Sequence, residues 1–393
     1  MNSQIKKKIA VFTTTRAEFG LLSGLLRAID QTDDLAYLLF AGGAHLAPEA
    51  GATIDEIRSS GITVIAEFDY LLNGDSSASL GKSLGIATCE LAQIFETYEF
   101  DAVCVLGDRF ELLAVVAMAV VFRKPIIHIH GGERTEGALD EQVRHMITKA
   151  AHIHFPACEE YAANIRNMGE SAWRIFNTGS LAADNIRYLK KIGKKSLFKE
   201  LQLSEDKPVV LLTWHPETMD EGTDSGSPLE TILEVLKTYD LQVVMTAPGV
   251  EHNRENIEKT ITKWVQRGPD YHYIKSLGMQ RYYSLLPECR FVIGNSSSGL
   301  IDAPYFRIPT INIGSRQDGR IRHASVIDAA ADKPSLKKAI DRAVSETFRQ
   351  SIGEMPYKFG DGTTAEKMIA ALRSLKFDAA LLNKKLDFPE QRS

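Results

Sequence analysis

Short runs of β-branched and other apolar residues alternate along the whole chain with longer stretches of helical periodicity. This alternation is typical of parallel strands joined by right-handed βαβ crossovers, because each parallel connection needs room for a helix. It therefore predicts an α/β fold made of doubly wound sheets. The expected strands are residues 8–14, 36–42, 101–108, 125–131, 152–157 and 174–179, followed in the second half by 208–215, 241–248, 271–276, 290–296 and 309–314.

A chain of 393 residues is longer than one hydrophobic core usually serves, so two domains are expected. A basic stretch with few prolines, residues 189–208, separates the two sets of strands and puts the boundary near residues 185–205. We expect a Rossmann-like domain at residues 1–190, a second one at 191–362, and a C-terminal helix with a tail at 363–393. Further helices are predicted at residues 110–122, 140–151, 228–239 and 256–266.

Charge and composition exclude several classes of partner. A net charge of −5 gives no overall field that would attract nucleic acid or an anionic membrane, so an anionic ligand needs a local cluster of cations. The four cysteines are widely spaced and mostly have apolar neighbours, which favours reduced thiols over disulfides or a zinc site. The longest apolar run falls short of the about 20 residues that span a bilayer. The N-terminus has too short an apolar run for a signal peptide. A cytoplasmic protein is expected.

Ligands of open α/β sheets bind beyond the carboxyl ends of the strands, and with two such domains the site is expected in the cleft between them. The first strand leads into "TTTRAEFG", which lacks the glycines of a dinucleotide-binding turn. Arg16 precedes a predicted helix there, where a guanidinium and free backbone N–H groups suit a phosphate; the alternative is a surface arginine. Asp108 and Arg109 follow the strand at 101–108. Without other evidence, a helix N-cap is the favoured explanation of Asp108.

The segment "HIHGGERTEGALDEQVRH", residues 128–145, leaves two kinds of chemistry open. His128 and His130 alternate with isoleucines, so on a strand they share one face and could bind a metal if a third ligand, such as His145, joined them. The alternatives are a buried structural histidine and an acid/base site built on His130, Glu133 and Asp140.

The second half supplies candidate anion ligands. His215 follows a strand in "TWHPET", and in "RFVIGNSSSGLIDAP" a buried strand ends at Gly294 before a run of serines opens a helix. Hydroxyl groups and a helix N-terminus can hold a diphosphate. Arg316 and Arg320, after the strand at 309–314, add the local positive charge that the whole chain lacks.

The segments "TTTRAEFG", "VLGDRFE", "IIHIHGGE", "LDEQVRHMITKAAH", "FNTGSLAADN", "TWHPET", "IGNSSSGLIDAP", "INIGSRQDGR" and "FGDGTTAEKMI", in this order, cover nearly the whole chain. Together they resemble the hydrolysing UDP-N-acetylglucosamine 2-epimerases of sialic acid synthesis. Related epimerases of legionaminic acid synthesis use a 2,4-diacetamido sugar nucleotide. The resemblance implies the glycosyltransferase-B architecture, a cytoplasmic homodimer or homotetramer, and no metal or other cofactor.

The resemblance also implies the reaction. The nucleotide is eliminated as H-2 is removed, and water then adds to the 2-acetamidoglucal with inversion at C2, giving N-acetylmannosamine and UDP from UDP-N-acetylglucosamine. The same reaction on a UDP- or GDP-linked 2,4-diacetamido-2,4,6-trideoxyglucose, or non-hydrolysing epimerisation, is the alternative. By resemblance the nucleotide ligands are Arg16, Arg109, His215, Ser296, Ser297, Asp302, Arg316 and Gln317, and the catalytic candidates are Asp108, His130, Glu133, Asp140, Asp184 and His215.

Two positions depart from the family pattern. Many members have a glutamate where this chain has His130, so the acid or base there is either His130 or Glu133, three residues on. In "TAPGVEHNRE" the chain has Gly249 and Glu251 where relatives usually have an Asn-x-Asp pattern near the sugar. This second difference makes the substrate's sugar substituents harder to predict than the reaction type.

Overall fold

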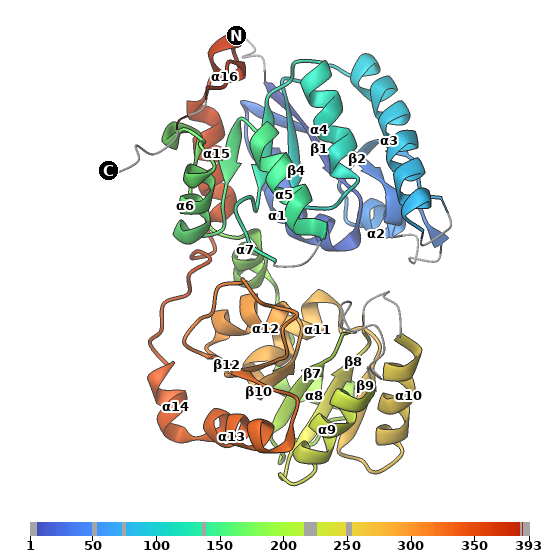
Figure 1. The fold of residues 1–393 in the computed structure, drawn as a ribbon, viewed down its shortest axis with the longest axis vertical. Helices are drawn as coiled ribbons and strands as arrows, with labels where there is room; N and C mark the ends of the chain where they lie inside the picture. The colour runs from blue at the N-terminus through green and yellow to red at the C-terminus, as the bar shows by residue number, and fades with distance from the viewer. Residues whose placement is uncertain are drawn as a thin grey trace. The chain divides into compact units, whose positions relative to one another are not determined.

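The computed structural model describes residues 6–48, 53–72, 76–135, 139–215, 226–248, 254–385 and 387. The chain forms two compact units, one of Met1–Arg187 with Phe359–Ser393 and one of Tyr188–Lys358. Each unit contains a six-stranded parallel sheet with helices on both faces (Figure 1). The predicted α/β fold with two doubly wound, Rossmann-like domains is therefore confirmed.

The first sheet has the strand order β3-β2-β1-β4-β5-β6. Its strands are β1 (Lys7–Thr13), β2 (Leu35–Gly42), β3 (Val64–Phe68), β4 (Ala102–Leu106), β5 (Ile126–Ile129) and β6 (Ile153–Phe155). All pairings are parallel, so every strand ends at the same edge. The order reverses between β1 and β4, which is where such sheets bind ligands.

Two hydrophobic cores cover the two faces of this sheet. One contains α1 (Arg16–Asp30), α2 (Ile54–Ser59) and α15 (Thr364–Ser374). The other contains α3 (Ser77–Thr97), α4 (Leu112–Val121) and α5 (Leu139–Ala150). Central strands such as β4 are buried along their whole length, which explains why they read as continuous apolar runs. The remaining helices of the unit are α6 (Glu159–Asn167), α7 (Leu181–Tyr188) and α16 (Ala379–Leu382).

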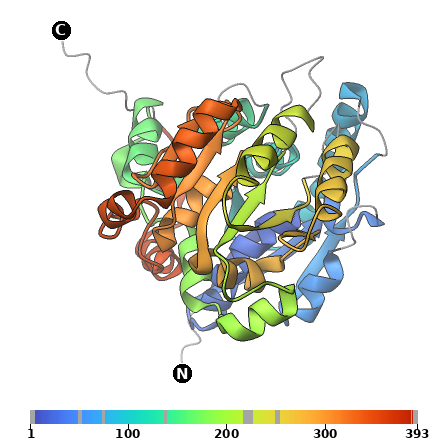
Figure 2. The same ribbon diagram turned by 90° about the horizontal axis from the view of Figure 1, so that it is seen from below.

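The second sheet has the order β12-β11-β10-β7-β8-β9. Its strands are β7 (Val209–Thr213), β8 (Gln242–Thr246), β9 (Tyr271–Ile274), β10 (Cys289–Gly294), β11 (Thr310–Ile313) and β12 (Val326–Ala329). One face packs against α9 (Gly226–Leu236), α10 (Arg254–Val265) and α13 (Lys333–Val344). Figure 2 shows these helices in yellow-green, gold and orange-red along that face. The other helices are α8 (Lys194–Leu201), α11 (Gly278–Leu285), α12 (Ser298–Ile301) and α14 (Glu346–Ser351).

The C-terminal segment is part of the first unit. Helix α15 packs against α1, and the Nζ of Lys7 on β1 donates to the carbonyls of Leu372, Arg373 and Leu375 at 3.1, 3.2 and 2.7 Å. Arg373 also forms an ion pair with Asp34 at 2.8 Å. These contacts tie α15 to the first unit's sheet.

Three details of the strand predictions were wrong. β3 and β12 were not predicted, because both are short edge strands whose residues are only partly buried. The strand expected at 174–179 does not form. Arg174 lies in a 3-10 turn, and only Ile175 bridges to the sheet, at His154. The chain then turns at Gly179, whose φ is +94°.

All four cysteines carry free thiols, three of them buried. Burial raises the pKa of Cys104 to about 12, so this thiol stays protonated. Within the described parts of the chain, no helix combines the length and the apolar character needed to cross a bilayer.

Candidate functional site

Polar side chains gather at the carboxyl edge of the first sheet. Leu106 at the end of β4 pairs with Ile129 at the end of β5. Asp108 and His130 therefore leave neighbouring strands at the same level. Because β1 is the other neighbour of β4, Arg16 follows the strand end on its far side. The sequence-predicted candidates of the first domain thus come mainly from three adjacent strand ends.

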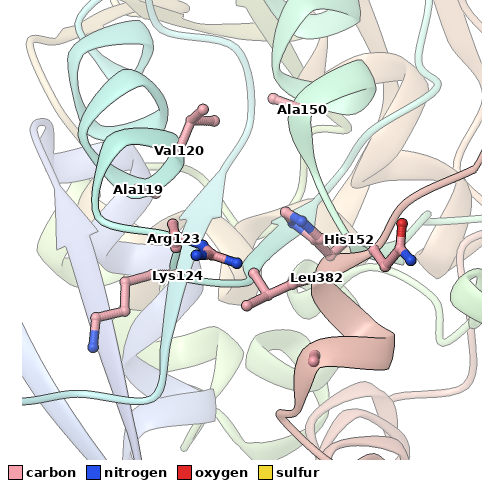
Figure 3. Close-up of a pocket in the computed structure, with 9 residues that line it drawn as sticks. Ala119, Val120, Arg123, Lys124, Ala150, His152 and Leu382 are labelled. Carbon is pink, nitrogen blue, oxygen red and sulfur yellow. The ribbon is translucent and has the colours of Figure 1, made fainter.

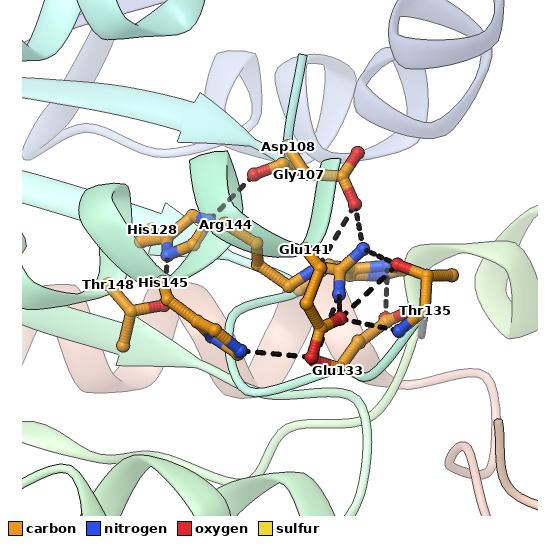
Figure 4. Close-up of polar contacts among 10 residues, drawn as sticks. Gly107, Asp108, His128, Glu133, Thr135, Glu141, Arg144, His145 and Thr148 are labelled. Carbon is orange, nitrogen blue, oxygen red and sulfur yellow. Dashed lines mark hydrogen bonds and ion pairs between the residues drawn. The ribbon is translucent and has the colours of Figure 1, made fainter. Parts of the chain in front are cut away.

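Asp108 is held by a buried arginine that the sequence analysis overlooked. Arg144 on α5 is 1% exposed, and its Nε donates to Oδ2 of Asp108 at 2.9 Å while its Nη2 donates to the same oxygen. Figure 4 shows the arginine reaching from α5 to the carboxylate. The Asp108 side chain stays 27% exposed, so the carboxylate is fixed on one side and accessible on the other.

The same guanidinium organises the loop that follows β5. Its Nη1 donates to the carbonyl of Glu133 at 2.9 Å and to Oε2 of Glu141 at 3.0 Å, and its Nη2 donates to Oγ1 of Thr135 at 2.8 Å. Oε2 of Glu141 also accepts from the N–H of Thr135 at 2.5 Å. The only sign of these contacts of Arg144 in the sequence is that it lies one helical turn after Asp140 and Glu141.

Asp140, on the first turn of α5, interacts electrostatically with Asp108. Partial burial of its carboxyl group, followed by the negative charge of Asp108, raises the pKa of Asp140 above its usual value. Two neighbouring carboxyl groups with different environments can divide the roles of proton donor and acceptor. The two predicted acids are therefore brought together.

The side chains of His130 and Glu133 are in contact. Nδ1 of His130 lies 3.1 Å from Oε1 of Glu133, and their side chains are 15% and 12% exposed. On the other side of the ring, Nε2 of His130 lies 3.3 Å from Oγ of Ser180. His130 has φ +65°, an uncommon conformation for a non-glycine residue that is enriched at functional sites.

The three histidines of this segment have separate partners. His128 is fully buried, with Nε2 2.8 Å from the carbonyl of Gly107 and Nδ1 3.2 Å from Oγ1 of Thr148, and burial lowers its pKa to about 3. His145 pairs with Glu141 at 3.0 Å. His128 and His130 do not share a face, since β5 ends at Ile129 and the backbone changes conformation at His130. Among the residues described, no cluster of three or more His, Cys, Asp or Glu side chains could hold a metal ion.

Arg109 and Arg16 are both paired with glutamates. Nε and Nη2 of Arg109 donate to Oε1 of the buried Glu111 at 3.2 and 3.1 Å. Burial opposes its charge, yet the carboxylates of Glu111 and Glu18 raise the pKa of Arg109. Arg16 pairs with Glu56 at 2.9 Å, and both side chains are more than half exposed. Such an exposed pair is weak, so a phosphate can compete for Arg16.

Asp184 contacts the backbone of α15. It is 3% exposed, and its two oxygens accept from the N–H groups of Thr364 and Ala365 at 2.8 and 2.7 Å. A carboxylate at a helix N-terminus satisfies donors that the helix itself leaves free. The contacts of Asp184 thus differ from those of the Asp108 cluster and hold the C-terminal helix in the first unit.

Replacing Asp184 is expected to weaken folding more than chemistry. Asp184→Ala leaves two buried N–H groups without acceptors and should lower the free energy of unfolding by about 2 kcal/mol, measured by urea denaturation. Asp378→Ala, at the exposed N-cap of α16, removes a similar cap and is the matched control. A catalytic role would be supported instead if Asp184→Asn kept wild-type stability and lost turnover.

In the second unit, the ends of β7 and β10 lie side by side. Gly294 pairs with Thr213 and has φ +138°; a Cβ at this position would lie 1.9 Å from the carbonyl oxygen of Thr213. Only glycine fits there. The next residue, Asn295, is fully buried, accepts from the N–H of His215 at 2.7 Å and donates to its carbonyl at 2.8 Å.

Asn295 also connects His215 to the loop after β11. Its carbonyl accepts from Nη1 of Arg316 at 3.3 Å and from Nε2 of Gln317 at 2.9 Å. Burial and then the positive charge of Arg316 lower the pKa of His215 to about 4, so its imidazole is neutral near pH 7. Three predicted nucleotide ligands, His215, Arg316 and Gln317, are therefore hydrogen-bonded to Asn295. Asn295 itself was not among the predicted site residues.

The serine run contributes hydroxyl groups rather than a long helix. Oγ of Ser296 lies 3.1 Å from Oγ of Ser298, and Ser297 precedes α12, which has only four residues and so adds little dipole. Burial raises the pKa of Asp302 to about 7, and the Tyr283 hydroxyl lies 3.3 Å from its carboxylate. Arg320 lies in the loop after β11, where its carbonyl accepts from Arg322 at 2.9 Å. Gly249 and Glu251 lie outside the described residues.

A cavity of about 570 Å³ lies elsewhere in the first unit (Figure 3). Its lining comes from the ends of α4 and α5 and from α16, and includes Arg123, Lys124 and His152. This is the amino edge of the sheet, opposite to Asp108 and His130. Cations there complement the carbonyl ends of two helices, so their presence needs no bound anion.

Comparison with known proteins agrees with this architecture. A family model described as UDP-N-acetylglucosamine 2-epimerase matches residues 27–373. The chain is 34% identical over 381 residues to the hydrolysing GDP/UDP-N,N'-diacetylbacillosamine 2-epimerase of Campylobacter jejuni, covering 96% of this chain and 98% of the relative. It is 29% identical to the hydrolysing UDP-N,N'-diacetylbacillosamine 2-epimerase of Legionella pneumophila, covering 96% and 98%.

A solved structure extends the comparison of the fold. The UDP-N-acetylglucosamine 2-epimerase of Neisseria meningitidis, bound to UDP-N-acetylglucosamine, superposes with a TM-score of 0.79 at 16% identity, over 94% of this chain and 100% of the other. At that identity the likeness supports the fold alone. With the family match spanning most of its length, the chain belongs to the UDP-N-acetylglucosamine 2-epimerase family.

Proposed function

We propose that this protein is a hydrolysing 2-epimerase that acts on a UDP- or GDP-linked 2,4-diacetamido-2,4,6-trideoxyglucose, which is N,N'-diacetylbacillosamine. The observation that carries the reaction type is the cluster of acid/base groups at one sheet edge, where Asp108 neighbours Asp140 and His130 pairs with Glu133. The substrate follows from the relatives in Campylobacter jejuni and Legionella pneumophila, each similar over 96% of this chain.

The reaction needs two proton transfers at C2, on different faces of the sugar. In the first step a base removes H-2, the bond between C1 and the glycosidic oxygen breaks, and the diphosphate leaves with the electron pair. In the second step an acid delivers a proton to C2 from the opposite face, while water adds to C1 and gives its proton to a base. Each step therefore uses positioned acid/base groups, and we assign them to Asp108, Asp140 and the pair formed by His130 and Glu133.

The second unit would hold the nucleotide. H-2 is a weak acid, so the departing diphosphate must be stabilised by cations and hydrogen-bond donors as its charge develops. Arg316, the neutral His215 and the serine hydroxyls of Ser296 and Ser297 suit this role. Asp302 would accept from ribose hydroxyls, and Gln317 would support the loop.

Proton NMR in D₂O tests the proposal. The enzyme receives the UDP- and GDP-linked diacetamido sugars and, in parallel, UDP-N-acetylglucosamine. Release of a free 2-epimerised diacetamido sugar with deuterium at C2 is the expected result. Turnover of UDP-N-acetylglucosamine alone would shift the substrate to that sugar nucleotide. An epimerised sugar still attached to its nucleotide would indicate the non-hydrolysing reaction, and no turnover would refute the proposal.

Arg316 is expected to contribute to nucleotide affinity. Arg316→Ala removes a charge-assisted contact and should weaken UDP binding by about 1.5 to 3 kcal/mol, measured by calorimetry. Arg307→Ala is the matched control, because Arg307 is an exposed arginine before β11 whereas Arg316 follows that strand. Equal UDP affinity in the Arg316 variant and the wild type would remove Arg316 from the site.

A further inference from the structure

We propose that Arg144 is a positioning residue for the reaction. It fixes the Asp108 carboxylate relative to the loop that carries Glu133. This inference rests on the proposed function and adds a residue to it. Arg144 reaches no substrate itself, since it is buried beneath the groups that it binds. Its effect on the reaction is exerted through Asp108 and through the backbone of Glu133.

The guanidinium of Arg144 makes five hydrogen bonds. Arginine has five N–H donors in a planar fork. In Arg144, Nε donates to Asp108, Nη1 to the Glu133 carbonyl and to Glu141, and Nη2 to Asp108 and to Thr135. One rigid side chain on α5 thereby joins residues that follow β4 to residues that follow β5.

Orientation of Asp108 follows from this arrangement. Both contacts from Arg144 go to Oδ2, so the carboxylate is anchored through one oxygen while the side chain stays 27% exposed. A lysine could offer charge to Asp108, but its single ammonium group lacks the planar fork that also reaches Glu133 and Thr135. Positioning and charge can therefore be separated by mutation.

The electrostatic surroundings define what the pH dependence should show. Asp108 faces the positive charge of Arg144 on α5 and the carboxyl group of Asp140 on the same helix. Glu133 and Glu141 also act on Arg144, and Arg109 acts on Asp140. Removal of Arg144 takes away a positive charge that lowers the pKa of Asp140 and of Glu141, so these carboxyl groups take up a proton at a higher pH.

The test compares kcat, nucleotide affinity and pH profile for Arg144→Met and Arg144→Lys. Arg144→Met should lower kcat by about 100-fold, the scale of a small misplacement of a catalytic group. In a plot of kcat against pH, the fall of kcat on the acidic side (the acidic limb) should shift to higher pH by about one unit. This is the scale of a lost carboxylate–arginine contact. UDP binding should stay near wild type. Arg144→Lys should lose kcat while its acidic limb stays near the wild-type position.

Chemical rescue and a matched control separate positioning from folding. In Arg144→Ala, added guanidinium ion should restore part of kcat. Arg174→Met is the control, because Arg174 is a 2% exposed arginine of the same unit whose N–H groups donate to the carbonyls of His152, Leu381 and Asn383. It should lose stability without a shift of the acidic limb. If Arg144→Met fails to fold, Arg144→Lys and guanidinium rescue decide.

The inference is overturned if Arg144→Met keeps the wild-type kcat. It is also overturned if kcat falls without a shift of the acidic limb and guanidinium restores nothing in Arg144→Ala. Failure of the proposed function has a different signature, because the wild-type enzyme itself would then turn over none of the sugar nucleotides.

Discussion

Asp108→Asn is expected to lower turnover by about 1,000-fold, a loss typical of removing a general acid or base. An asparagine has nearly the same shape, and its oxygen can still accept from Arg144, so the loop and α5 keep their positions. What is lost is the negative charge and the ability to take up a proton. UDP affinity should change little, because the nucleotide ligands are assigned to other residues.

Asp101→Asn provides a control at the other end of the same strand. Asp101 precedes β4 at the opposite edge of the sheet, where its carboxylate accepts from the N–H of Lys8 at 2.7 Å. The same change of charge there should leave turnover close to that of the wild type. A large loss of UDP binding in Asp108→Asn would assign Asp108 to the nucleotide instead, and wild-type turnover would remove it from the chemistry.

The parts of the fold that were predictable from sequence are those with a local physical signature. Central strands such as β4 and β5 are buried on both faces and appear as apolar runs ending in polar residues. The positions of Asp108 and His130 followed directly from those strand ends. Edge strands such as β3 are half exposed and carry a weaker pattern, which is why they were missed.

Contacts between distant residues had no local signature. The link between Asp184 and Thr364 spans 180 residues, and the one between Arg144 and Asp108 spans 36. Nothing near Asp184 shows that its carboxylate meets a helix N-terminus, and an arginine on an amphipathic helix normally faces solvent. Asn295 was overlooked for a similar reason, because its bonds to His215 form only when β7 and β10 pair.

The contact between His130 and Glu133 predicts that their variants lose kcat to different extents. Because Nδ1 of His130 lies 3.1 Å from Oε1 of Glu133, the glutamate orients the ring and Nε2 faces away from it, toward Ser180. We therefore expect His130 to transfer the proton. Glu133 orients the imidazole ring, as a carboxylate orients the histidine of a catalytic triad.

His130→Gln should reduce kcat by about 1,000-fold, as expected for a lost general acid or base. Glu133→Gln should reduce it by about 100-fold, because the ring keeps its proton chemistry and loses only its fixed orientation. His145→Gln is the matched control, since His145 also pairs with a glutamate, Glu141, at 3.0 Å but is 38% exposed and has no assigned role in the reaction. Steady-state kinetics with the diacetamido sugar nucleotide gives all three values. A greater loss in Glu133→Gln than in His130→Gln would reverse the two roles, and equal rates in the His130 and His145 variants would exclude His130 from the chemistry.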